Sequence, residues 1–223
     1  MDIGEILYIA SIWALPVLLA VTLHEAGHAW VAWRLGDPTA KQRGRVSFNP
    51  LRHVDPFGTV ILPALLVFMN SPFLFGWAKP VPVDFRRLGK PRRDMILVAA
   101  AGPVTNLLLA FIALLLFHAV PLLPEGTDQW AAKNLVNAVR LNLVLAVFNM
   151  LPLPPLDGGR VAVGLLPARL AIKLARLERY GLFIVIGLFF FAPTLLGLDV
   201  FGWLVAIPVE FLFNMMAILT GHG

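Results

Sequence analysis

Segment 22–30 contains two histidines and a glutamate in the pattern HExxH. In an α-helix, His24 and His28 lie one turn apart on the same face, so both imidazoles can reach one ion. Glu25 is offset by about 100° around the helix and would lie beside that ion rather than on it. This placement suits a base that acts on metal-bound water, whose pKa a zinc ion lowers towards ~7. The pattern therefore predicts a hydrolytic metal site.

The surroundings of the pattern distinguish a metal site from an ordinary charged helix face. Three fixed residues out of five occur by chance in many soluble helices, where they form an exposed polar surface. Here they lie inside the apolar stretch 6–33, where each ionisable group costs about 2.5–3.5 kcal/mol at a helix centre. Ionisable side chains within a membrane are functional by default, and metal coordination offsets their cost. The setting favours the metal site.

A hydrolytic zinc site uses three protein ligands and one open position, so a third ligand must come from elsewhere in the chain. The chain has no cysteine, which leaves His, Asp and Glu as donors. Asp157 is the best candidate because it follows a proline-rich break, 152–155, at a depth where irregular backbone must line a cavity or be packed in protein. Asp157 could instead cap the following helix. The weaker candidates are His53, Asp55, Asp84, Asp94 and His118.

The elements that must position these groups are membrane-spanning helices. Of 223 residues, 59% are hydrophobic and 14% are charged, and the mean hydropathy is +0.80. This composition excludes an ordinary soluble domain, in which about 25% of residues are charged. Six apolar stretches reach or approach the roughly 20 residues needed for a crossing. They are 6–33, 59–75, 95–120, 135–152, 180–198 and 200–219.

The basic residues predict the orientation of these helices. Of the 18 Lys and Arg residues, 16 lie in segments 34–55, 76–94 and 158–179. This placement indicates the cytoplasmic side of a membrane, rather than a nucleic-acid surface. A full crossing by 59–75 would leave six positive charges outside, so we predict that this stretch dips in and returns. The fold is then all-α and polytopic with five crossings, the N-terminus outside and the C-terminus inside; the alternative has six.

The loops and the overall organisation complete this prediction. Residues 41–48 alternate weakly around Gly44 and predict a small β-hairpin. Pro80 and Pro82 keep 76–85 extended. With no separate soluble module in the sequence, we expect one integral-membrane domain over 1–223, with a core at about 6–165 and accessory helices at about 180–220.

Five motifs along the chain resemble the site-2 protease family of intramembrane zinc metalloproteases, peptidase family M50. They are HEAGH at 24–28, RHVDPFG at 52–58, GWAKPVPV at 76–83, AGPVTN at 101–106 and NMLPLPPLDGGR at 149–160. The resemblance is to the compact bacterial branch, which lacks a PDZ-like or a nucleotide-sensing CBS module. Within these motifs Gly102 and Asn106 are expected to pack helices, and the hairpin resembles an edge strand that pairs with substrate.

The resemblance assigns a role to each residue of the site. It implies that His24, His28 and Asp157 bind one zinc ion and that Glu25 activates the water. It implies that Asn149 holds the scissile carbonyl or the oxyanion, as a neutral donor can in a dry site. A hydrogen bond between helices is the alternative for Asn149.

The expected function is hydrolysis of peptide bonds in or near transmembrane segments of single-pass membrane proteins, that is, regulated intramembrane proteolysis. The expected location is a bacterial cell membrane, with the active site near the cytoplasmic side. The alternative is a metal transporter, or a catalytically silent membrane protein that uses the same ligands. A transporter is typically built from two related halves with paired interrupted helices, and only the break at 152–155 is clear here. The sequence leaves the oligomeric state open.

Overall fold

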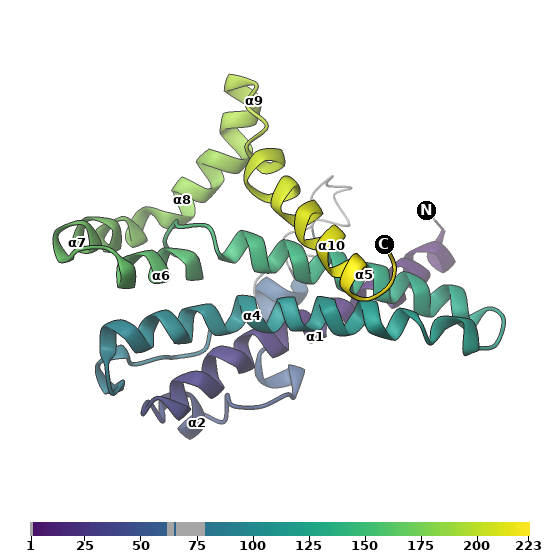
Figure 1. Ribbon diagram of the computed structural model, residues 1–223, viewed down its shortest axis with the longest axis horizontal. Coiled ribbons are helices and arrows are strands. Elements are labelled where there is room, and N and C mark those ends of the chain that lie inside the picture. Colours follow the sequence, from purple (N-terminus) through teal and green to yellow (C-terminus); the bar gives the residue numbers. More distant parts are fainter. Residues whose placement is uncertain (1, 62–64, 66–78) are drawn as a thin grey trace.

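Three long helices form the bundle that carries the chemistry. The computed structural model describes residues 2–61, 65 and 79–223. The bundle helices are α1 (Ile3–Arg34), α4 (Pro91–Phe117) and α5 (Thr127–Asn149), and each packs against the other two (Figure 1).

The first helix is well defined at both ends. Asp2 accepts a hydrogen bond from the amide of Glu5, and Glu5 accepts one from the amide of Asp2, which forms a capping box. The helix then runs for 32 residues to Arg34, and the chain turns away through Gly36, whose φ of 110° a glycine adopts without strain. The whole HExxH pattern therefore lies inside one continuous helix.

Small residues line the contacts between the bundle helices. The buried hydrophobic positions of α1, α4 and α5 are mostly alanines, which let the helix backbones approach closely. They are Ala20, Ala26, Ala29, Ala32, Ala99, Ala110, Ala113 and Ala146. Close approach of α1 to α4 brings the α1 histidines within hydrogen-bond distance of α4.

Large apolar side chains cover the outside of the described structure. Four helices are long and apolar enough to cross a membrane: α1, α4, α5 and the segment Gly202–Leu219. Leu, Ile, Phe and Trp side chains are exposed along them, which is expected where lipid replaces water as the solvent. The predicted all-helical class is confirmed for the described residues. The number of crossings is not fixed by these four helices alone.

A tight turn after α5 folds the chain back over the bundle. Helix α6 (Asp157–Leu165) begins seven residues after Met150, and α7 (Ala168–Arg176) follows it. A Cβ on Gly158 would overlap the carbonyl of Met150, and one on Gly159 would overlap the backbone of Pro154. These two glycines are needed because they let α6 pack directly on the turn, with Asp157 at its first position.

The C-terminal segment 181–219 leaves the bundle and returns to it. It comprises α8 (Gly181–Ile186), the π-helical turn η6 (Gly187–Phe191), α9 (Ala192–Leu196), the π-helical turn η7 (Gly202–Ala206) and α10 (Ile207–Leu219). The chain bends sharply between α9 and α10, where Gly197 has a φ of 64°. Figure 1 shows α8–α9 and α10 as the two arms of an inverted V above the bundle, with its apex next to α9.

The two chain ends lie at the same end of the bundle, which corrects the predicted topology. Near the N-terminus, Trp130 donates to Ser11 across α1 and α5 over 3.0 Å. Near the C-terminus, a ring nitrogen of His118 lies 2.7 Å from the carbonyl of Thr220. The prediction of an outside N-terminus and an inside C-terminus is therefore wrong. Helix α8 starts beside Pro154, at the opposite end of the bundle, and α10 ends beside α4.

Two local predictions have different outcomes. Residues 41–48 hold the end of α2 (Thr39–Gln42) and then turns, with Gly44 at φ 64°, so the predicted hairpin is not confirmed. The π-helical turn η2 (Pro56–Ile61) covers the start of the stretch predicted to re-enter. Apart from residue 65, the remainder of 59–75 lies outside the described residues, so re-entry stays a prediction.

Candidate metal centre

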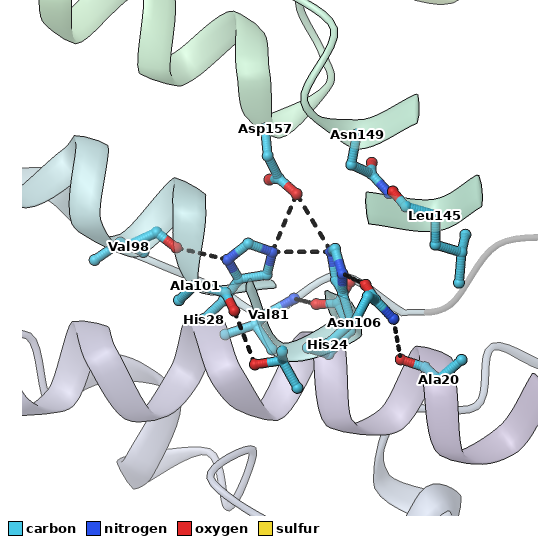
Figure 2. A network of polar contacts seen from close by, with 12 residues as sticks. Ala20, His24, His28, Val81, Val98, Ala101, Asn106, Leu145, Asn149 and Asp157 are labelled. Carbon is cyan, nitrogen blue, oxygen red and sulfur yellow. Dashed lines mark hydrogen bonds and ion pairs between the residues drawn. The ribbon is translucent and has the colours of Figure 1, made fainter. Parts of the chain in front are cut away.

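Two histidines and one aspartate from distant parts of the chain meet inside the bundle (Figure 2). The Nε2 atoms of His24 and His28 lie 3.0 Å apart on one face of α1. The Oδ2 atom of Asp157, at the start of α6, is 3.3 Å from each of them. All three residues are 8% exposed. The predicted ligand set is thus brought together, and Asp157 makes no side-chain cap to α6.

The triangle of ligand atoms has the dimensions of a zinc site. Zinc lies 2.0–2.2 Å from nitrogen and oxygen ligands in tetrahedral geometry, which separates two ligand atoms by about 3.3 Å. The observed edges of 3.0, 3.3 and 3.3 Å match that spacing. A Cβ on Gly102 of α4 would overlap His28 Nε2 and lie 2.6 Å from His24 Nε2. Because Gly102 has no side chain, the space next to the two Nε2 atoms stays free.

Hydrogen bonds to the other ring nitrogens give each imidazole the tautomer that a metal requires. His28 Nδ1 lies 2.7 Å from the carbonyl oxygen of Val98, which can only accept, so the proton is on Nδ1. His24 Nδ1 lies 2.5 Å from Oδ1 of Asn106. A ring with its proton on Nδ1 has its lone pair on Nε2, and both Nε2 atoms lie 3.3 Å from Oδ2 of Asp157. Such outer hydrogen bonds orient metal-binding histidines and raise their basicity.

A chain of two asparagines fixes the direction of the hydrogen bond to His24. The amide nitrogen of Asn142 donates to the carbonyl of Ala138 over 2.8 Å, so its oxygen faces Asn106. Asn106 donates its own amide to that oxygen over 2.7 Å and to the carbonyl of Ala20 over 3.3 Å. The oxygen of Asn106 is left to accept from His24. Both asparagines are at most 2% exposed.

The sequence does not predict this relay. It predicts a helix-packing role for Asn106 and gives no role to Asn142. Each of two apolar stretches contains a polar amide side chain. Such an amide indicates an internal hydrogen bond, but it does not identify the group at the other end. Which residue an amide contacts depends on how α4 and α5 are rotated about their axes. The 3.6-residue period of a helix shows which residues share a face, but not which face meets the neighbouring helix.

We expect Asn106→Leu to weaken zinc binding by about 10–100-fold, because His24 loses the acceptor that sets its tautomer and ring orientation. Zinc affinity can be measured by competition with a metal-binding dye in detergent. Asn134→Leu is the matched control, since Asn134 is also buried and donates only along its own helix, to Trp130. Equal zinc affinity in the two variants would contradict a role for the relay.

Glu25 lies beside the three ligands, as the helical offset predicts. Its Oε2 accepts a hydrogen bond from the backbone amide of Val81 over 2.8 Å. Val81 belongs to segment 79–84, which is neither helix nor strand. The side chain is partly buried and is not one of the three converging groups. Glu25 is thus held by segment 79–84 and stays outside the ligand triangle.

Asn149 is not brought into contact with the three ligands. It is the last residue of α5, and its amide nitrogen donates to the carbonyl of Leu145 over 3.0 Å. Figure 2 shows its side chain near Asp157 but directed along its own helix. In this arrangement Asn149 forms no hydrogen bond between the described helices, and its amide does not point toward the three ligands, as binding of a substrate carbonyl would require.

Comparison with known proteins agrees with this geometry. The family model for peptidase family M50 matches residues 12–137 and 124–192. A Bacillus subtilis protein named "Putative zinc metalloprotease YwhC" is 43% identical over 183 residues, which cover 78% of each chain. The Mycobacterium tuberculosis protein named "Putative zinc metalloprotease Rip2" is 36% identical over 182 residues, 81% of this chain and 66% of the relative. No solved structure matches. With its family model covering most of the sequence, this chain belongs to peptidase family M50 and is a zinc metallopeptidase of multi-pass membrane type.

Proposed function

We propose that this protein cleaves peptide bonds in or near transmembrane segments of single-pass membrane proteins, as in regulated intramembrane proteolysis. The observation that carries the proposal is the convergence of His24, His28 and Asp157 inside a bundle of apolar helices. A hydrolytic centre buried there meets substrates that are themselves in the membrane. The unit that does this is the single domain 1–223, with its core at about 6–165 and accessory helices at about 180–220.

The three ligands would hold one zinc ion. Bound there, zinc supplies a Lewis acid that polarises the scissile carbonyl and lowers the pKa of a coordinated water. Glu25 is the general base: Val81 holds its Oε2, which leaves Oε1 to accept a proton from the attacking water. The protonated carboxyl then gives the proton to the leaving amine.

Asn149 would stabilise negative charge on the carbonyl oxygen. Its amide is an uncharged donor at the end of α5, on the same side of the bundle as Asp157. To act in this way it must turn its amide away from the carbonyl of Leu145. Binding of an extended substrate segment is the event that would supply a new acceptor.

The orientation in the membrane follows from the basic residues. The end of α1 at Arg34, the start of α4 and helices α6–α7 lie at one end of the bundle, which we call the basic end. Lys and Arg residues concentrate there, so this end faces the cytoplasm by the positive-inside rule. The bacterial relatives support a bacterial cell membrane as the location.

A reconstituted cleavage assay tests the proposal. The wild type is placed in liposomes with a panel of single-span peptides, each paired with a variant that has one Leu→Gly change in the span. We expect cleavage within the membrane, about five-fold faster for the glycine variant, because one glycine costs a helix about 1 kcal/mol and the backbone must unwind to react. Metal-dependent ion flux without cleavage would support a transporter instead, and neither flux nor cleavage would support the silent form.

A further inference from the structure

A positively charged hollow lies at the basic end, beside the metal centre but not part of it. Its volume is about 370 Å³, and we call it the basic hollow. Its lining residues are Arg43, Arg45, Arg52, Lys79, Pro80 and Pro82. Four cationic side chains thus face one space, and no carboxylate is among the lining residues.

No carboxylate compensates this charge in the part of the chain that the structure describes. None of the four cations forms an ion pair there with Asp or Glu. The Nε2 atom of His53 lies 2.9 Å from the carbonyl oxygen of Ser47, and burial lowers the pKa of the His53 imidazole. Like charges that share one space repel one another unless an anion lies between them.

In a neighbouring hollow, the positive charges of two arginines are paired with a carboxylate. It is lined by Thr39, Arg43, Pro82, Val83, Asp84, Arg86 and Arg87. Here Asp84 pairs with Arg86 at 3.0 Å and with Arg87 at 3.5 Å. The hydrogen bonds from Arg86 hold the pKa of the Asp84 carboxyl below its usual range. Arg43 and Pro82 line both hollows, but Asp84 pairs with Arg86 and Arg87 and not with Arg43.

The walls of the basic hollow are held in place by hydrogen bonds. Arg45 is 7% exposed, and its Nη2 donates to the carbonyls of Lys79 and Pro80 over 2.9 and 3.3 Å. Arg52 donates to the carbonyl of Gly44 over 2.7 Å. These bonds use part of each guanidinium fork and leave further N–H groups for a ligand. The remaining cations, Arg43 and Lys79, are exposed.

The residues around the hollow are of the kinds that occur at the level of lipid headgroups. Phe48 and Leu51, in the loop between Arg45 and Arg52, are 79% and 81% exposed. At the end of α1, the guanidinium of Arg34 lies 5.1 Å from the ring of Trp30, an arrangement typical of the membrane interface. Apolar tips beside a cationic hollow fit a surface with acyl chains below and phosphates above. An acidic soluble peptide offers no apolar layer for Phe48 and Leu51.

We propose that the basic hollow binds the phosphate of an anionic phospholipid headgroup from the leaflet at the basic end. The bound headgroup supplies the negative charge that the hollow lacks, and its acyl chains lie against Phe48 and Leu51. Free phosphate shares the headgroup's charge but not its chains, so the two can be told apart.

Hydrogen bonds link the wall of the basic hollow to Glu25. Its wall includes the backbone of Lys79 and Pro80, which Arg45 holds, and the next residue, Val81, donates to Glu25. A headgroup in the hollow therefore stabilises the segment that positions the carboxylate. This consequence rests on the proposed role of Glu25 as base, whereas binding of the lipid does not.

The experiment measures lipid binding without substrate. Full-length protein in neutral detergent is titrated with fluorescent phosphatidylglycerol or phosphatidylcholine, and phosphatidylglycerol is expected to bind selectively. The test variant is Arg43→Gln with Lys79→Gln, which keeps the hydrogen bonds of Arg45 and Arg52. We expect it to bind phosphatidylglycerol about 30-fold more weakly, at roughly five-fold for each cation removed near a membrane surface.

The control removes the same charge elsewhere at the basic end. Arg169→Gln with Lys173→Gln lies on the exposed face of α7, and its affinity should stay close to that of the wild type. Equal weakening in both variants, or no preference for phosphatidylglycerol, would overturn the proposal. So would displacement of the lipid by inorganic phosphate or an acidic peptide at concentrations similar to those of unlabelled phosphatidylglycerol. Since no cleavage is measured, failure here is distinct from failure of the protease assignment.

Discussion

Glu25→Gln should abolish cleavage while the protein keeps its zinc. The amide is nearly the same size as the carboxylate and can still accept the hydrogen bond from Val81. It cannot take a proton from water, and loss of a general base typically costs 10²–10⁴-fold in rate. We expect at least about 10³-fold slower cleavage. The ligands His24, His28 and Asp157 are unchanged, so zinc content should equal that of the wild type.

The control for this change is Glu210→Gln. Glu210 is an exposed carboxylate in the first turn of α10, in another apolar helix. Its replacement removes the same charge without touching the site, and cleavage should continue at the wild-type rate. A Glu25→Gln enzyme that still cleaves would refute the assignment of the base, and one that loses zinc would show that Glu25 is a ligand.

Gly102→Ala should destroy the metal site with a single methyl group. The added Cβ overlaps His28 Nε2 and lies 2.6 Å from both Nε2 and Cε1 of His24, and contacts this short force the rings to move. Both rings are packed between α1 and α4, so they can give way only by leaving the metal. We expect zinc affinity to fall by more than the ~100-fold that loss of an outer hydrogen bond can cost, and cleavage to fall with it.

Gly187→Ala is the matched control, because a Cβ at Gly187 meets nothing within 4 Å. It tests whether a methyl group in an apolar helix is harmful in itself. Thermal stability in detergent should be measured on both variants, so that loss of zinc is separated from unfolding. A folded Gly102→Ala protein that binds zinc as tightly as the wild type would show that the space beside Gly102 is not where the metal lies.

Much of the metal centre could be predicted from the sequence because its constraints are local or chemical. The one-turn spacing of His24 and His28 fixes two ligands on one face of a helix. The depth of Asp157 and the prolines before it identify an irregular segment that must be packed in protein. Asp157 then meets both rings at 3.3 Å in the structure.

The features that sequence reasoning missed depend on how helices are rotated and directed. Hydropathy gives the length of an apolar stretch, but it does not show that α8–α9 and α10 lead the chain back to the end of the bundle where the N-terminus lies. The Asn142–Asn106 relay depends on which faces of α4 and α5 meet. The hydrogen bond from Val81 to Glu25 joins positions 56 residues apart, and proline content predicts only that the segment is extended.

Zinc-edge X-ray absorption on the purified wild-type protein, with the zinc content measured on the same sample, tests the central claim most directly. We expect one zinc per chain, bound by two imidazole nitrogens from His24 and His28 and by oxygen ligands that include Asp157, at about 2.0–2.2 Å. A zinc-loaded sample whose spectrum lacks the scattering of two imidazoles, or a wild-type protein that retains no zinc, would contradict it.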